Sequence, residues 1–218
     1  MPERSELRQR LRLMVITDRA LAGERGWLAV VEAALAAGAT SVQLRDKGAT
    51  SAELLELARQ LRPLAERHEA LFLVNDRFDV ALAAGAHGVH LGADDLPVAE
   101  VRRVVPRDFV IGRSADTETD ARAAERDGAD YLGVGSVFGT RSKQEVIGEV
   151  IGTDRLARVA KAVSIPIVGI GGVTPANAAQ VAAAGAAGIA VLSAVMAAPD
   201  PAAATRALLE SWKQGRGG

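Results

Sequence analysis

The sequence contains no cysteine, has almost no net charge and lacks an apolar run long enough to cross a membrane. Without cysteine, the chain cannot form a disulfide, a thiolate metal site or a thiol nucleophile. A formal net charge of -1 gives no overall basic field, so nucleic acid and anionic membranes are not expected partners. Any site for an anion must therefore be a local cluster of cations.

The length and composition fit one folded unit. The chain has 218 residues, of which 49% are hydrophobic and 24% are charged, enough for one domain with a substantial core. We expect a single domain over residues 1–218, with residues 1–10 as an N-terminal extension and residues 214–218 as a loose tail. The first twelve residues are charged and lack the apolar core of a signal peptide, so we expect a cytoplasmic protein.

Short apolar segments alternate with longer segments of helical period along the chain, a pattern typical of parallel strands covered by helices. The predicted strands are residues 11–17, 41–45, 71–74, 88–91, 109–112, 131–134, 167–170 and 188–192. Helices are predicted between them, including residues 26–37, 51–68 and 116–127, with N-cap residues expected within 51–54. Eight repeated β/α units predict a closed (β/α)8 TIM barrel, in which reactive groups gather at the carboxyl ends of the strands.

The most informative polar cluster is Gln43, Arg45 and Lys47, at every second position near the end of the second predicted strand. Alternate strand residues share a face, so an amide, a guanidinium and an ammonium would converge on one point. Two cations and an amide suit a diphosphate, because the guanidinium forks onto phosphate oxygens and the ammonium supplies compact charge. The alternative is an exposed strand end with solvated charges.

Two aspartates follow the next two predicted strands. Neighbouring strands lie about 4.8 Å apart, so the carboxylates of Asp76 and Asp95 can reach one ion. One or two carboxylates, water and substrate phosphate oxygens make the usual octahedron of Mg²⁺, so the pair predicts a magnesium site. Each aspartate has a structural alternative as a turn or helix cap, and Asp94 competes as a ligand.

Small residues dominate the ends of the last three predicted strands. Residues 133–143 form either a functional lid or a plain connector. Residues 167–173 and 190–193 predict a phosphate site, which recurs after the seventh and eighth strands of this fold, with tight packing as the alternative. The histidines do not predict a zinc site, because His87 and His90 are separated by an odd number of positions and face opposite sides of a strand.

Six segments, each at the end of a predicted strand and in chain order, resemble the thiamine phosphate synthase family. They are residues 42–47 (VQLRDK), 74–77 (VNDR), 88–92 (GVHLG), 111–114 (IGRS), 140–143 (TRSK) and 169–173 (GIGGV). The resemblance covers nearly the whole chain and implies a TIM barrel with two phosphorylated small-molecule substrates. It implies that 4-amino-2-methyl-5-(diphosphooxymethyl)pyrimidine and 4-methyl-5-(2-phosphooxyethyl)thiazole are joined to thiamine phosphate, with release of diphosphate.

The resemblance also implies a role for individual residues. The pyrimidine diphosphate would contact Gln43, Leu44, Arg45, Asp46, Lys47, Asn75, Ser114 and Lys143. The thiazole phosphate would contact Thr140, Arg141, Ser142, Gly172, Leu192 and Ser193, and Asp76 and Asp95 would bind Mg²⁺. Arg45, Lys47, Lys143 and Ser114 would act in a dissociative substitution, in which the bond to diphosphate breaks before the thiazole nitrogen captures the carbocation. Such chemistry needs electrostatic stabilisation and exclusion of water but no protein nucleophile.

The chain departs from the family pattern at Ser136 and Gly139, which replace two prolines, and at Ser142, which replaces a threonine. Two other functions fit a similar barrel: a thiazole tautomerase and a non-catalytic protein that binds a phosphate ligand. The cations and both aspartates argue against the tautomerase, which lacks part of the diphosphate machinery. A homo-oligomer is also compatible with the sequence, because helices that cover a barrel look the same whether or not they pair.

Overall fold

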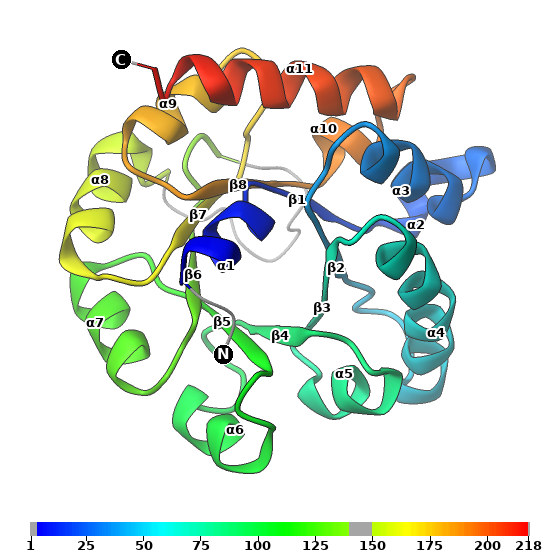
Figure 1. Cartoon of the computed structure of the whole chain (residues 1–218), viewed down its shortest axis with the longest axis horizontal. Coiled ribbons are helices and arrows are strands. Elements are labelled where there is room, and N and C mark those ends of the chain that lie inside the picture. Colours follow the sequence, from blue (N-terminus) through cyan, green and yellow to red (C-terminus); the bar gives the residue numbers. More distant parts are fainter. Residues whose placement is uncertain (1–3, 140–149, 218) are drawn as a thin grey trace.

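The computed structural model describes residues 4–139 and 150–217 and has eight parallel strands that close into a barrel (Figure 1). Each strand pairs with the next in chain order, and the last pairs with the first. The strands are β1 (Leu13–Ile16), β2 (Ser41–Leu44), β3 (Leu71–Asn75), β4 (Gly88–Leu91), β5 (Val110–Ser114), β6 (Tyr131–Val134), β7 (Ile167–Ile170) and β8 (Gly188–Val191). The predicted TIM barrel is confirmed, and the predicted strand ends differ from these by two residues at most.

Helices surround the barrel and connect its strands. They are α1 (Arg4–Arg10), α2 (Arg19–Ala22), the 3-10 helix η1 (Gly23–Arg25), α3 (Trp27–Ala36), α4 (Ser51–Arg67), α5 (Phe78–Ala84), α6 (Val98–Val104), α7 (Glu118–Arg126), α8 (Gly152–Ala162), α9 (Ala178–Ala183), α10 (Ser193–Met196) and α11 (Pro201–Gln214). The N-cap of α4 is Thr50, one residue before the predicted window, and Thr50 forms a capping box with Glu53. Among these helices of the described chain, none combines the length and apolarity needed to span a bilayer.

Alternation along the strands produces two separate cores. Val42, Leu44 and Leu91 point outward and are buried between the strands and the helices. Met14 and Leu73 point inward and fill the barrel with other apolar side chains. Because the side-chain period of a strand is two, the parity of a residue decides whether its side chain reaches the barrel interior.

The described residues near both termini pack against the barrel. Helix α1 lies across one opening of the barrel (Figure 1), and Leu7, 4% exposed, packs there with Leu11 against the inner core. At the other end, α11 continues to Gln214, and Gly215 packs so tightly on α9 that an added Cβ would lie 2.1 Å from the Ala179 carbonyl oxygen. Residues 4–10 are therefore part of the barrel closure, and α11 includes Gln214, the first residue of the predicted tail.

Candidate active site

Gln43, Arg45 and Lys47, predicted to share one face of β2, lie at its end and in the turn that follows. The strand ends at Leu44, so the two-residue period stops before Arg45. Gln43 is only 3% exposed and lies inside the barrel, where its Nε2 donates to the Met14 sulfur at 3.6 Å. Arg45 is half-buried at the mouth, and Lys47 is exposed in the turn that follows. The cluster therefore extends from the barrel interior to its rim.

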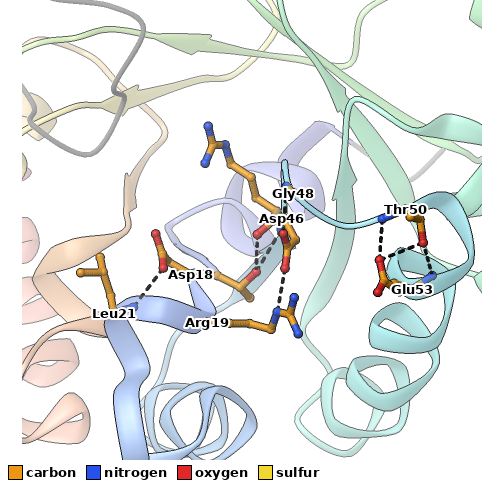
Figure 2. Close-up of polar contacts among 9 residues, drawn as sticks. Asp18, Arg19, Leu21, Asp46, Gly48, Thr50 and Glu53 are labelled. Atoms are coloured by element: carbon orange, nitrogen blue, oxygen red, sulfur yellow. Dashed lines mark hydrogen bonds and ion pairs between the residues drawn. The ribbon is translucent and has the colours of Figure 1, made fainter.

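Hydrogen bonds from neighbouring segments set the shape of the loop after β2. The buried Thr17 hydroxyl accepts from the Arg45 backbone N–H at 3.0 Å and donates to the Arg45 carbonyl at 3.3 Å. The Asp46 carboxylate accepts from the Gly48 N–H at 3.1 Å and pairs with the Arg19 guanidinium at 2.6 Å (Figure 2). These contacts hold the backbone on either side of the two cations.

Leu44 and Asp46 were predicted to contact the pyrimidine diphosphate, but their side chains make other contacts. The Leu44 side chain belongs to the outer core, because its parity directs it toward the helices. The Asp46 carboxylate is occupied by Arg19 and by its own turn, and a carboxylate repels a diphosphate. Both residues shape the loop that carries Arg45 and Lys47, and their predicted contacts to substrate are limited to the backbone.

Asp76 and Asp95 lie against each other at the ends of β3 and β4. Asp76 has a positive φ of 62°, and its N–H donates to the His90 carbonyl at 2.8 Å. The Asp95 carboxylate accepts from the Gly92 N–H at 2.6 Å and hydrogen-bonds the Asp76 carboxyl group. Asp94 is exposed on the same loop. The geometry thus favours Asp95 over Asp94 as the partner of Asp76.

Burial and the neighbouring Asp95 raise the pKa of Asp76 to about 6, while the charges of Lys47 and Arg45 act in the opposite direction. A carboxylate pair of this kind shares a proton or holds a cation. Its donors are hard oxygens, which Mg²⁺ prefers, and this donor set fits the ion. In residues 4–139 and 150–217 no group of three or more His, Cys, Asp or Glu side chains is arranged for a metal, so water and phosphate oxygens would complete the coordination.

An arginine that the sequence analysis did not single out holds the loop of Asp95. The Arg113 guanidinium extends from β5 and donates to the carbonyl oxygens of Gly92 and Ala93. Gly92 is also the residue whose N–H binds the Asp95 carboxylate. Arg113 therefore fixes the backbone that orients one of the two acidic groups. The sequence feature that could have indicated a role for Arg113 is its position next to Ser114, a predicted site residue.

Polar residues from four neighbouring strands, β3 to β6, lie near the carboxyl ends of the strands or inside the barrel. Asn75 ends β3 and lies in register with His90 of β4. The His90 ring contacts the Ser114 hydroxyl through Nε2 at 3.0 Å and the Tyr131 hydroxyl through Nδ1 at 2.9 Å. Ser114 was predicted as a substrate contact, whereas His90 was set aside with the other histidines. Its inward parity on an apolar strand was the signal for a role in the interior.

The loops after β6 and β7 pack on each other. The N–H groups of Val137 and Phe138 donate to the carbonyls of Ile170 and Gly171 at 2.9 and 3.0 Å. Gly172 has a φ of 66°, and a Cβ there would lie 2.2 Å from the Gly139 carbonyl oxygen. The described glycines of these loops thus permit close backbone packing, which was the structural alternative in this region.

The remaining residues predicted to contact the thiazole phosphate lie at the start of α10 or outside the described residues. Asn177 holds the β7 loop, because its Nδ2 donates to the Gly172 carbonyl at 3.0 Å. Leu192 precedes α10 and is half-buried, and Ser193 is the exposed first residue of that helix. Thr140, Arg141, Ser142 and Lys143 lie outside the described residues.

The closed barrel, with cations, an acidic pair and small-residue loops along its carboxyl rim, defines the class of TIM-barrel enzymes that act on phosphorylated small molecules. Residues 13–195 match the family model described as thiamine monophosphate synthase, and the chain belongs to this family. It is accordingly a transferase of thiamine biosynthesis.

Individual relatives agree with the family model. A thiamine-phosphate synthase of Roseiflexus castenholzii is 50% identical over 90% of this chain and 86% of its own length. One of Moorella thermoacetica is 50% identical over 94% of this chain and 97% of its own length. The solved thiamine phosphate pyrophosphorylase of Pyrococcus furiosus superposes with a TM-score of 0.88 at 43% identity, covering 97% of this chain and all of that one.

Proposed function

We propose that the rim of this barrel is the active site of a thiamine phosphate synthase and that Asp76 and Asp95 hold Mg²⁺ there. The reaction joins 4-amino-2-methyl-5-(diphosphooxymethyl)pyrimidine to 4-methyl-5-(2-phosphooxyethyl)thiazole and releases diphosphate. The chain's membership of the thiamine monophosphate synthase family supports this reaction.

The observation that carries the metal assignment is the contact between the two carboxyl groups beside two cations. Arg45 and Lys47 both act electrostatically on Asp76, so all three belong to one local field. A diphosphate with a bound cation is complementary both to the two cationic side chains and to the two carboxyl groups. Its oxygens would pair with the guanidinium and the ammonium, and the two carboxylates would hold Mg²⁺.

The pyrimidine substrate then extends from the rim into the barrel. Arg45, Lys47 and Asn75, together with Lys143, hold the diphosphate. Gln43 and Ser114 lie nearer the interior and face the pyrimidine ring. Leu44 and Asp46 act through the shape of their loop, as their side-chain contacts require.

The thiazole substrate occupies the opposite side of the rim. Gly172, Leu192 and Ser193 hold its phosphate, together with Thr140, Arg141 and Ser142. Support comes from the positive φ of Gly172, which turns the β7 loop toward the β6 loop, and from Asn177, which keeps it there. Phosphate binding after the seventh and eighth strands is common in this fold.

The reaction proceeds by dissociative substitution. The carbon–oxygen bond to the diphosphate breaks first, and the electron pair leaves with the diphosphate. The thiazole nitrogen lone pair then captures the pyrimidine-stabilised carbocation and forms the new carbon–nitrogen bond. Arg45, Lys47 and Lys143 stabilise the leaving group, and Ser114 orients the ring. When bound, Mg²⁺ neutralises further charge on the diphosphate oxygens.

The experiment is a product assay with both phosphorylated precursors and Mg²⁺. Purified protein should form thiamine phosphate and diphosphate in equal amounts, and absence of product at high enzyme concentration would reject the proposed function. Asp76→Asn should lower turnover at least about 100-fold, because one ligand of the ion loses its charge. Asn is preferable to Ala at this site, since Asn tolerates the left-handed conformation of Asp76.

The matched control is Asp94→Asn, which removes an exposed carboxylate from the loop that carries Asp95. It should leave turnover within about twofold of the wild type. Equal losses in both variants would argue for a general effect of negative charge rather than for Asp76 as a ligand. Cytoplasmic location and a homo-oligomeric state stay predictions from the sequence.

A further inference from the structure

Three polar side chains form a continuous chain across the inside of the barrel. Tyr131 of β6 contacts His90 of β4 at 2.9 Å, and His90 contacts Ser114 of β5 at 3.0 Å. The His90 and Tyr131 rings lie 5.5 Å apart between centroids, at 36° to each other. Tyr131 is 1% exposed, while Ser114 is half-buried near the rim. These three hydrogen-bonded side chains therefore connect the apolar interior of the barrel to the proposed pyrimidine subsite.

Two glycines make room for the rings. Gly112 of β5 and Gly133 of β6 both occupy inward positions, in register with neighbours on adjacent strands. A Cβ at Gly112 would lie 2.1 Å from the Tyr131 ring, and one at Gly133 would lie 2.9 Å from the His90 ring. Barrel interiors are normally filled by branched aliphatic side chains. Here two such positions are left open for aromatic groups that carry hydrogen-bonding atoms.

The contacts of the Tyr131 hydroxyl indicate which atoms donate and which accept in this series of hydrogen bonds. Burial raises the pKa of its hydroxyl, so this group stays neutral and keeps one proton to donate. The Gln43 side chain also interacts with this hydroxyl and acts to lower its pKa, against the larger effect of burial. Nδ1 of His90 lies 2.9 Å from this hydroxyl and, in the Nε2–H tautomer of the imidazole, accepts the phenolic proton. A buried hydroxyl left without an acceptor would be destabilising.

We propose that His90 and Tyr131 are positioning residues that make Ser114 a hydrogen-bond donor to the pyrimidine substrate. With Nδ1 as acceptor, the His90 ring carries its proton on Nε2 and donates it to the Ser114 oxygen. The Ser114 proton is then directed to the barrel mouth. A ring nitrogen of an aminopyrimidine is an acceptor of matching chemistry. This assignment rests on the proposed function, because it takes the pyrimidine diphosphate as the ligand at Ser114.

The first test is a double-mutant cycle in steady-state kinetics. Tyr131→Phe keeps the ring and removes the donor, and it should raise the KM for the pyrimidine diphosphate about 10-fold, with the KM for the thiazole phosphate unchanged. In a Ser114→Ala background the same substitution should have little further effect, because the residue through which it acts is gone. Independent, multiplicative losses would overturn the proposal.

A control variant separates this role from packing inside the barrel. Val168→Ala also alters the inner core but lies outside the chain of hydrogen bonds. It should lower the melting temperature, and its effect on KM should be the same with and without Ser114. Coupling of Val168→Ala to Ser114 as strong as that of Tyr131→Phe would also reject the positioning role.

The second test reads the proton position directly in the wild-type protein, and a variant serves only to assign the signal. Nitrogen-15 NMR of the three histidines in the wild-type protein should show one ring in the Nε2–H tautomer, assigned by its loss in His90→Gln. An Nδ1–H tautomer at His90 would overturn the proposal. This measurement needs no substrate, so it tests the hydrogen-bond directions at His90 independently of the proposed function. The proposed function is tested by the product assay.

Discussion

The contact between Asp76 and Asp95 predicts an unusual pH dependence of stability. Asp76 has a pKa raised from its ordinary value of 3.8 to about 6. The folded state therefore holds the Asp76 proton more tightly than the unfolded state does. The resulting stabilisation is present below about pH 3.8 and is lost as the pH rises through about 6. Without a divalent cation, this pair makes the protein less stable at pH 8 than at pH 4.

The rise from 3.8 to about 6 corresponds to about 3 kcal/mol, at about 1.36 kcal/mol for each pH unit. Asp76 is only partly buried, so solvent screening reduces the expected effect to about 1–2 kcal/mol. Asp76→Asn removes the titrating charge, and Asn accepts the positive φ at this position as Asp does. The backbone contribution therefore cancels in the comparison.

The assay is urea denaturation of the wild type and of Asp76→Asn between pH 4 and pH 8 in EDTA. The variant should gain about 1–2 kcal/mol relative to the wild type across this range, and the exposed control Asp94→Asn should gain much less. Added Mg²⁺ should raise the stability of the wild type at pH 8 more than that of Asp76→Asn. Parallel pH curves for the wild type and Asp76→Asn would refute the reasoning.

Three further predictions follow from individual contacts. Leu7→Ala should lower the free energy of unfolding by about 2–4 kcal/mol, since Leu7 is buried at the closed end of the barrel, whereas the more exposed Leu21→Ala should cost under about 1 kcal/mol in the same urea titration. Gly172→Ala should cost at least about 2 kcal/mol and raise the KM for the thiazole phosphate, because its φ of 66° and a carbonyl oxygen 2.2 Å from the new Cβ both oppose a side chain; an unchanged KM with normal stability would contradict this. Arg113→Met should weaken Mg²⁺ binding, followed by calorimetry, about 10-fold relative to Arg103→Met, whose arginine pairs only with exposed Glu100 in the described contacts.

The bounds of the strands show what the sequence alone can predict. The segments for β4, β6 and β7 were predicted at their observed bounds, because buried strands of a parallel barrel are short apolar runs between helical segments. The pairing of Asp76 with Asp95 also followed, since parallel strands place their carboxyl ends at one edge. Both results depend only on chain order and on the parallel topology that a β/α repeat enforces.

The end of β2 shows where such reasoning stops. Whether Arg45 continued the strand depended on Thr17, a residue 28 positions earlier whose hydroxyl binds the Arg45 backbone. The observed strand therefore ends at Leu44, one residue sooner than predicted. In the same way, Asp95 was distinguished from Asp94 by tertiary contacts with the Gly92 N–H and the Asp76 carboxyl group.

The sequence by itself determined the barrel, the rim on which the chemistry lies, and the family to which the chain belongs, because periodicity and ordered motifs are local properties of the chain. The tertiary structure decided which side chains meet: Asp46 with Arg19, Arg113 with the β4 loop, and His90 with Tyr131 and Ser114. It also decided that residues 4–10 close the barrel. These contacts join strands and loops far apart in the chain, and their geometry is set by packing, which no local pattern encodes.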